Sequence, residues 1–323
     1  MRATQTDVRF WRQFAVTAYS VILTLLFSAI SIYVSNDYGW ALFVFIPLMT
    51  GALPTLLWGR DLPITPALAF KMGFYAINIS FLAFFIMGLE GMICIFMAAI
   101  PAYLLVLCGS ALAYFFVKRK RAQANKAALV LILSVPAAQW AEKDSSPELR
   151  PIMTPVEINA PPREVWELVI AFPPIAEPED WLFRAGIAYP THATIAGQGV
   201  GAVRHCQFTT GPFVEPITAW EPPHRLAFDV IAQPAPMNEL SMWHVDAPHL
   251  HDFFVSERGQ FALVALSDGR TRLEGTTWYR HDIRPAFYWQ WWSDHIVHRI
   301  HLRVLEHIKA LAEKSAFDYD FQE

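Results

Sequence analysis

Four long stretches of apolar residues lie within the first 117 residues of this 323-residue chain, and they constrain its fold more than any other feature. These stretches are residues 14–34, 38–58, 67–87 and 91–117. The only charged side chain in them is Lys71, near the start of the third stretch, where a lysine can extend to the lipid head groups. A helix needs about 20 mainly apolar residues to cross the hydrocarbon core of a bilayer. The sequence therefore predicts a bundle of at least four transmembrane helices.

Basic residues lie at one end of each predicted span, and they set its orientation. They are Arg2, Arg9, Arg12, Arg60, Lys71 and the run at 118–121. The loops at 35–37 and 88–90 contain no basic residue. The positive-inside rule then places the N-terminus and the run at 118–121 in the cytoplasm. A cleaved signal peptide is the alternative interpretation of 14–34, but its apolar core is long for one and three further spans follow.

Residues 127–141 form a shorter apolar stretch that decides where the rest of the chain lies. At 1.5 Å per residue the stretch extends about 22 Å, against a hydrocarbon thickness of about 30 Å. It can cross as a fifth helix, which places the following residues outside the cytoplasm. It can also lie flat in the cytoplasmic interface, which keeps those residues inside. The basic run before it suits the inner end of a new span, and we therefore favour crossing.

Charge divides the chain into two parts. Residues 1–126 carry ten Lys or Arg and four Asp or Glu, whereas the remainder carries 15 basic and 25 acidic residues. An acidic soluble part argues against binding to nucleic acid, and the basic run is a topology signal at a helix end. The three cysteines have neither the spacing of a zinc site nor that of a disulfide framework, so they do not decide the compartment.

The second part of the chain has the pattern of an α+β domain. We expect a transmembrane region over 1–141, a polar linker over 142–153, a domain over 154–316 and a short tail over 317–323. Within the domain a first strand begins at Val156, and a Pro-Pro pair then opens a helix near 163–172. Several strands follow, including a hairpin of 259–266 with 271–281, and an amphipathic helix over about 285–314 closes the domain. This order predicts an antiparallel sheet that wraps a long C-terminal helix.

Several segments of this domain resemble the SRPBCC superfamily, which is also called START-like or helix-grip. They are VEINAPPREVWELV at 156–169, GQGVGAVRHCQF at 197–208, EPITAWEPPHRLAFDV at 215–230 and GRTRLEGTTWYR at 269–280. The resemblance covers about residues 152–315 and implies a largely apolar cavity between sheet and C-terminal helix. Members include lipid carriers, polyketide cyclases and dehydratases, hormone receptors and chaperone activators, so the fold alone does not fix an activity.

Aromatic and imidazole side chains are the expected lining of that cavity. Nine of the twelve tryptophans lie at or after Trp140. An aromatic cavity would suit an apolar or planar ligand, whereas ordinary core packing is the alternative for each ring. The candidates are Trp181, Tyr189, His205, Trp220, Phe228, Trp243, Tyr279, Trp292 and His295.

Ionisable residues give weaker signals of chemistry. His295, His298 and His301 recur every third residue of the last helix, but no third ligand with zinc spacing follows, so we expect no metal and no cofactor. Arg204, His205, Glu215 and Glu274 are ionisable residues in apolar strands, where cross-strand charge pairs such as Arg204 with Glu274 are the common outcome. The irregular stretch 233–252, with His244, His249 and His251, is either a mobile gate or a surface loop.

The function that these observations favour is a multi-pass membrane protein whose domain binds a lipid or another hydrophobic small molecule. Membrane lipids and that ligand are the expected partners, and protein partners are open. Two alternatives stay open. One is a cyclase- or dehydratase-type enzyme that acts on an apolar substrate, with His205 or His295 as acid or base. The other is an interaction or sensing protein.

Overall fold

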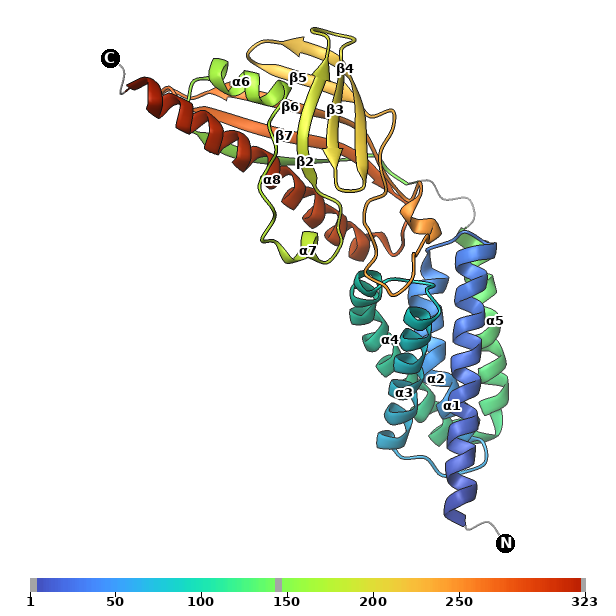
Figure 1. Ribbon diagram of the computed structural model, residues 1–323. Helices are drawn as coiled ribbons and strands as arrows, with labels where there is room; N and C mark the ends of the chain where they lie inside the picture. The colour runs from blue at the N-terminus through green and yellow to red at the C-terminus, as the bar shows by residue number, and fades with distance from the viewer. Residues whose placement is uncertain (1–4, 143–146, 321–323) are drawn as a thin grey trace. The chain divides into compact units, whose positions relative to one another are not determined.

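The computed structural model describes residues 5–142 and 147–320, and the chain divides into two compact units. The helical unit comprises Met1–Ser146, Glu239–Pro248 and Ile283–Ala286. The sheet unit comprises Pro147–Asn238, His249–Asp282 and Phe287–Glu323. Figure 1 shows the elements of both units along the chain. Residues 143–146 of the expected linker, residues 321–323 of the expected tail and Arg2 lie outside the described residues.

The helical unit is built from long apolar helices. They are α1 (Gln5–Ala29) with its π-helical continuation Ile30–Val34, the π-helical turn Ala41–Phe45 with α2 (Ile46–Gly59), α3 (Pro66–Ile86), α4 (Met92–Lys120), the 3₁₀ turn Arg121–Gln123 and α5 (Ala124–Glu142). Four helical stretches are long and apolar enough to cross a membrane: Asp7–Val34, Ala41–Gly59, Pro66–Ile86 and Met92–Glu142. The prediction of four such helices is confirmed.

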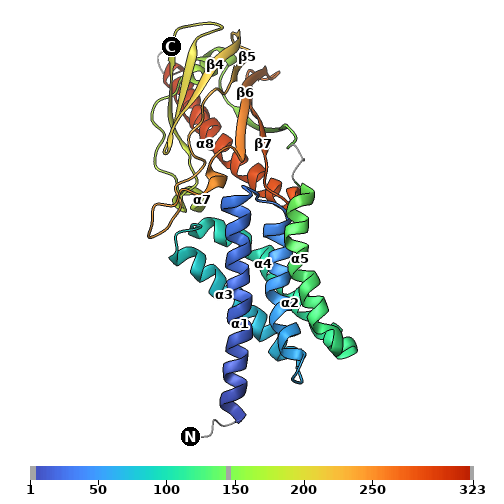
Figure 2. The same ribbon diagram turned by 90° about the vertical axis from the view of Figure 1, so that its right-hand side faces the viewer.

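Helix α5 runs the full length of α2 in the opposite direction (Figure 2). At its start, the Arg60 guanidinium donates to Asn125 Oδ1 at 3.4 Å. At its end, the Trp40 backbone N–H donates to Glu142 Oε2 at 2.9 Å. The helix has 19 residues, which is more than the stretch 127–141, and at 1.5 Å per residue it extends about 28 Å.

Small and hydroxylated residues bring the helices of this unit close together. A Cβ at Gly51 would overlap the Val106 carbonyl of α4, and a Cβ at Gly109 would overlap the Leu48 carbonyl of α2. The Ser110 hydroxyl donates to the Gly51 carbonyl at 3.0 Å across the same contact. Such residues are typical of contacts between helices in a lipid bilayer, where burial of apolar side chains contributes little to helix association.

Two segments from the second part of the sequence pack in the helical unit. Segment 239–248 is fixed to the turn between α3 and α4, where the Met92 N–H donates to the Leu240 carbonyl at 3.0 Å. In the same segment the Trp243 indole donates to the Ile86 carbonyl at 2.7 Å. Segment 283–286 is held by Arg284, whose N–H donates to the Tyr38 carbonyl at 2.8 Å. Both segments fall within the range 154–316 expected for one domain.

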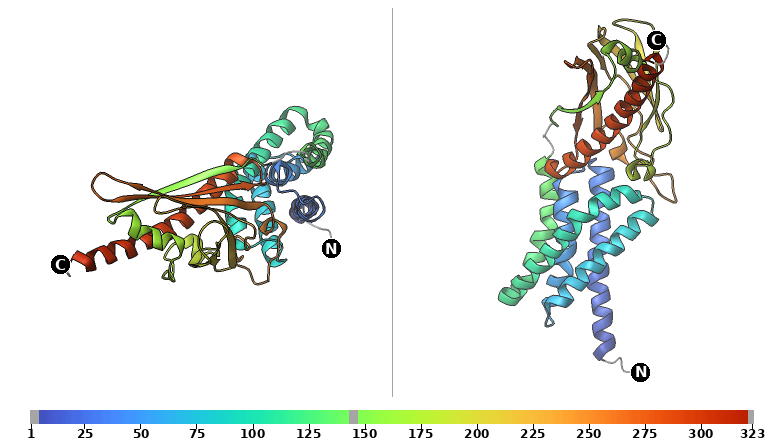
Figure 3. Two further views of the ribbon diagram at one scale, coloured as in Figure 1. Left: turned by 90° about the horizontal axis from the view of Figure 1, so that it is seen from above. Right: turned by 90° about the vertical axis from the view of Figure 1, so that its left-hand side faces the viewer.

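The sheet unit is a seven-stranded antiparallel sheet with a long helix along one face (Figures 1 and 3). Its strands are β1 (Arg150–Ile158), β2 (Pro190–Ala196), β3 (Val203–Phe208), β4 (Gly211–Glu221), β5 (Arg225–Asp229), β6 (Phe254–Ala265) and β7 (Thr271–His281), in the spatial order β1-β7-β6-β5-β4-β3-β2. The helices are α6 (Pro162–Ile170), α7 (Trp181–Arg184) and α8 (Ala286–Asp320), and a 3₁₀ turn covers Pro248–Leu250. The helix-grip layout and the hairpin of β6 with β7 are confirmed.

The core of the sheet unit joins three elements. Val165 and Val169 of α6 meet the inner strand residues, and Leu305 and Ile308 of α8 pack on the same cluster. Strand β1 begins at Arg150, so the last residues of the range expected to be a linker are strand. Helix α8 continues to Asp320, into the range expected to be a tail. The long helix and the sheet therefore enclose the space in which the candidate site lies.

Candidate ligand-binding site

A cavity of about 120 Å³ lies inside the sheet unit, between the central strands and α8. Most of the side chains that line it are apolar. They include Phe208, Phe213, Phe228, Val230, Phe254, Phe261, Val297, Ile300, Val304 and Leu305. Strands supply the aromatic rings and α8 supplies the aliphatic side chains, because β-alternation and helical periodicity each turn one face inward. The volume is below the 300–1,000 Å³ that is usual for ligand pockets, so only a small molecule fits this arrangement.

A buried ion pair forms one wall of the cavity. Arg204 is 1% exposed and Glu215 is 5% exposed, and a hydrogen bond joins the guanidinium to the carboxylate. The two residues are direct neighbours across β3 and β4. The Arg204 Nε–H also donates to the Ile170 carbonyl at 3.1 Å. The guanidinium is 5.5–5.7 Å from the ring centres of Phe172, Phe228 and Phe261, which is cation–π distance.

Burial controls the protonation of the groups beside this pair. Desolvation raises the pKa of the Glu215 carboxyl, and the Arg204 guanidinium opposes that rise. Desolvation also raises the pKa of the Cys206 thiol to about 12. The thiol is thus neutral at physiological pH, and a neutral thiol is a poor nucleophile. The site holds a compensated charge pair and no activated sulfur nucleophile.

Two histidines of α8 share one threonine next to the cavity. Thr154 Oγ1 lies 2.8 Å from His298 Nδ1 and 2.9 Å from His301 Nδ1. The Nε2 atom of His301 lies 2.7 Å from Thr277 Oγ1 on β7. Burial lowers the pKa of His301 to about 4, and the nearby His298 contributes to the shift. His301, which lines the cavity, is therefore neutral near pH 7, and threonine hydroxyls contact both of its ring nitrogens.

Of the nine cavity residues predicted from the sequence, Phe228 lines this cavity. Trp220 instead packs edge-on against Trp166, with ring centres 5.7 Å apart, beside a surface groove. Tyr189 donates to Glu177 at 3.2 Å. Trp181 is 52% exposed on α7. These three aromatic residues lie in the sheet unit but not in the cavity wall.

The remaining candidates occupy other environments. Tyr279 is fully buried and its hydroxyl donates to Asp294, while Trp292 is buried on α8. Trp243 belongs to the helical unit and is 57% exposed. His205 and His295, the two candidate acid or base residues, do not line the cavity.

The two faces of β3 explain the position of His205. Arg204, Cys206 and Phe208 are buried and line the cavity, so His205 between them points to the other face. His295 is exposed on α8 and stacks on Trp291 at 6.0 Å between ring centres. Arg204 does not pair with Glu274, which instead binds Arg272 at 2.8 Å. The sequence singled out Arg204 and Glu215 as ionisable, but the register that joins them is a long-range property.

Comparisons with known proteins give only distant structural matches. No family model matches the sequence, and no curated protein matches it. Similar solved structures include a protein from Nitrosospira multiformis, with 15% identity over 52% of this chain and 99% of that one and a TM-score of 0.33. Truncated norcoclaurine synthase from Thalictrum flavum has 15% identity over 52% of this chain and 96% of that one, with a TM-score of 0.34. The ZhuI aromatase/cyclase from a Streptomyces species has 16% identity over 52% and 96%, with a TM-score of 0.32. The sheet unit itself, an antiparallel sheet with a long C-terminal helix along one face, has the fold that the SRPBCC resemblance implies.

Proposed function

We propose that this chain is a multi-pass membrane protein that binds a small hydrophobic molecule or a lipid in the cavity of its sheet unit. The observation that carries the proposal is the cavity between sheet and α8, lined mainly by apolar side chains. Ligand pockets are concave and mostly apolar, with a few polar groups that orient the ligand. Thr276, Thr277 and His301 are such polar groups in the lining.

The buried charges of the site favour a neutral ligand, since Arg258, the other charged residue of the lining, is exposed and lies 4.7 Å from the Trp278 ring centre. The Arg204 guanidinium is compensated by Glu215, and His301 is neutral near pH 7. An anionic ligand would have to displace the Glu215 carboxylate from its partner, which would leave that carboxylate buried and unpaired. A hydrocarbon or aromatic body with one hydroxyl or carbonyl group matches this lining. A lipid would need more room than this cavity provides, because its volume is about 120 Å³.

The membrane role rests on the helical unit. Large apolar side chains cover the outside of α1, α3 and α4, among them Ile22, Leu82 and Leu104. Since α5 runs the length of α2, we infer that it crosses as a fifth span. With the basic ends in the cytoplasm, the residues after Glu142 then lie on the opposite side of the membrane.

A catalytic role is the second candidate, and His301 favours it. Its imidazole lies in the cavity wall and contacts the hydroxyls of Thr154 and Thr277. A neutral imidazole could accept a proton from an apolar substrate, as in a cyclase or dehydratase. The pKa of about 4 makes it a weak base, and we therefore place binding before catalysis.

Native mass spectrometry of the full chain in detergent tests the binding proposal. Ile300→Trp adds an indole to the cavity wall, and Ala310→Trp adds the same group to an exposed position of the same helix. We expect a bound small-molecule mass in the wild type and in Ala310→Trp, and its loss in Ile300→Trp. Equal ligand occupancy in both variants would refute this cavity as the site.

His301→Gln separates the two candidate functions. If the protein is a carrier, the variant keeps most of its ligand, because glutamine can still hydrogen-bond to the two threonines. If the protein is an enzyme, the variant accumulates an unconverted ligand whose mass differs from that found in the wild type. A wild type that binds nothing, even from a total lipid extract, would contradict both.

A further inference from the structure

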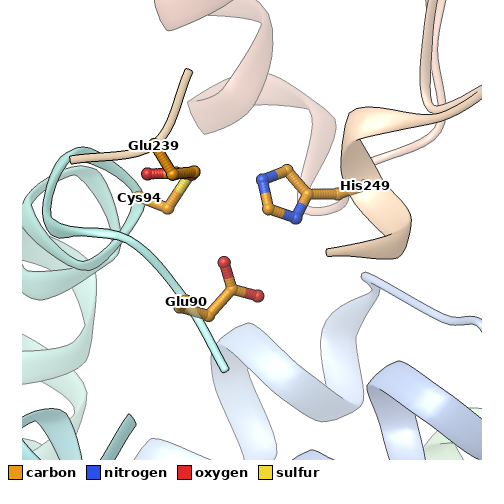
Figure 4. A group of neighbouring side chains, drawn as sticks. All are labelled: Glu90, Cys94, Glu239 and His249. Atoms are coloured by element: carbon orange, nitrogen blue, oxygen red, sulfur yellow. The ribbon is translucent and has the colours of Figure 1, made fainter. Parts of the chain in front are cut away.

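Three metal-binding side chains meet in the helical unit, and none of them lines the cavity of the sheet unit. They are Glu90 in the turn between α3 and α4, Cys94 in the first turn of α4, and Glu239 in segment 239–248 (Figure 4). Their ligand atoms lie within 4.8 Å of one another. Cys94 Sγ is 2.6 Å from Glu239 Oε1, within hydrogen-bond reach of its thiol. Figure 4 also labels His249, which belongs to the sheet unit.

The backbone around this cluster is shaped to admit the Glu239 side chain. A Cβ at Gly91 would overlap the Glu239 carboxylate, so only glycine leaves the room that this carboxylate occupies. The Met92 N–H, one residue further, holds the Leu240 carbonyl at 3.0 Å. The Tyr38 hydroxyl lies 3.3 Å from Glu90 Oε1 and orients the second carboxylate.

We propose that Glu90, Cys94 and Glu239 bind a thiophilic divalent cation of the Zn²⁺ class. Two carboxylates and a thiol at this separation repel one another once they ionise, and a divalent cation removes that repulsion. The thiolate selects against Mg²⁺ and Ca²⁺, which prefer oxygen ligands. Zinc accepts sulfur at about 2.3 Å and carboxylate oxygen at about 2.0–2.2 Å, so small rotations of these side chains bring all three into its first shell.

The cation would join segment 239–248 to the start of α4. Three protein ligands leave the fourth tetrahedral position to a water molecule. On binding, the Cys94 thiol loses its proton to solvent, and we expect about one proton released per cation at neutral pH. This proposal does not rest on the ligand proposed for the cavity.

Zinc titration of the tag-free full chain in detergent, in competition with a chromophoric chelator, tests the site. We expect one Zn²⁺ per chain and at least tenfold weaker binding in Cys94→Ser and in Glu239→Gln. Cys108→Ser removes the other thiol of α4, which is exposed, and should bind as the wild type does. Gly91→Ala leaves all three ligands in the chain but blocks the place of the Glu239 carboxylate, and it should also weaken binding.

Cobalt provides a spectroscopic readout of the thiolate ligand. Co²⁺ bound by the wild type should give a thiolate-to-metal charge-transfer band, and that band should be absent in Cys94→Ser and present in Cys108→Ser. Thermal unfolding profiles identify any variant that fails to fold. A wild type that binds no Zn²⁺ at millimolar concentration, a Co²⁺ complex without the band, or a folded Cys94→Ser with wild-type affinity would each overturn the proposal.

Discussion

The buried pair of Arg204 and Glu215 yields the sharpest test of the cavity. Both side chains are almost fully buried, and three phenylalanine rings surround the guanidinium. Removing one partner of a buried pair leaves an uncompensated charge and costs about 3–5 kcal/mol. We expect that loss of unfolding free energy in Arg204→Met and in Glu215→Gln. The double variant Arg204→Met/Glu215→Leu has no unpaired buried charge. Its free energy of unfolding should lie within about 2 kcal/mol of the wild-type value.

The pH dependence separates the two single variants. In Arg204→Met the carboxyl of Glu215 can take up a proton, and its folded-state pKa, already raised by burial, rises further without the guanidinium. The folded state then holds more protons than the unfolded state, in which a glutamate titrates near about 4.3. The stability of Arg204→Met therefore falls as the pH rises from about 4.3 through the raised pKa. Arg204 cannot lose its proton, so Glu215→Gln lacks this trend.

These free energies are measured by urea titration of the full chain in detergent. Limited proteolysis of the sheet unit reports the unfolded fraction at each urea concentration. The pair of exposed Arg272 and partly buried Glu274 on β7 is the matched control, and Arg272→Met should cost less than about 1 kcal/mol. Losses below 1 kcal/mol in both buried single variants would refute the assignment of this pair to the core. So would an Arg204→Met variant whose stability increases with pH over that window.

Three further predictions concern His301, the cavity glycines and the fifth helix. The folded-state pKa of His301 is about 4, below its usual 6.5, so the unfolded state binds more protons. The free energy of unfolding should therefore fall by up to about 3 kcal/mol as the pH drops from 6.5 to 4. His301→Gln should remove that part of the pH dependence of the unfolding curves. Gly259→Ala should lower the unfolding free energy by about 1–3 kcal/mol, because its Cβ would lie 2.6 Å from Phe228, whereas Gly275→Ala, with Leu305 at 3.5 Å, should change it by less than about 1 kcal/mol in the same assay. In a cysteine-free background, Glu148→Cys should react with an impermeant maleimide from outside the cell and Asn125→Cys should not, and equal labelling of both from one side would rule out a crossing α5.

Periodicity was enough to predict the strands and the two longer helices of the sheet unit, but neither the short helix α7 nor which face of each strand is inward. On β3 the sequence offers one face with Val203 and His205 and another with Arg204 and Cys206. A charge is expected on the solvent side, yet Arg204 is buried because β4 places Glu215 directly opposite it. Register between strands is a long-range property that a single sequence does not reveal.

Aromatic content was a poor guide to the cavity for a related reason. Trp220 and Trp166 pack against each other in another part of the sheet unit, whereas phenylalanines of β3, β4, β5 and β6 form the cavity wall. Residue type indicates that a ring will be buried somewhere, and only the packing decides where. The cluster of Glu90, Cys94 and Glu239 was missed because its members are separated by up to 149 positions and follow no metal-ligand spacing.

The two segments that pack in the helical unit are neighbours in sequence of three elements that form the cavity wall. Segment 239–248 ends shortly before β6, and segment 283–286 joins β7 to α8; these three elements carry Phe254, Thr277 and Val304 of the lining. A truncated chain that begins at residue 147 would lack Tyr38, Ile86 and Met92, the hydrogen-bond partners of these segments. The freed backbone groups of these segments would have to find water or new partners. We therefore expect a truncated sheet unit to bind the proposed ligand more weakly than the full chain does, even if it folds.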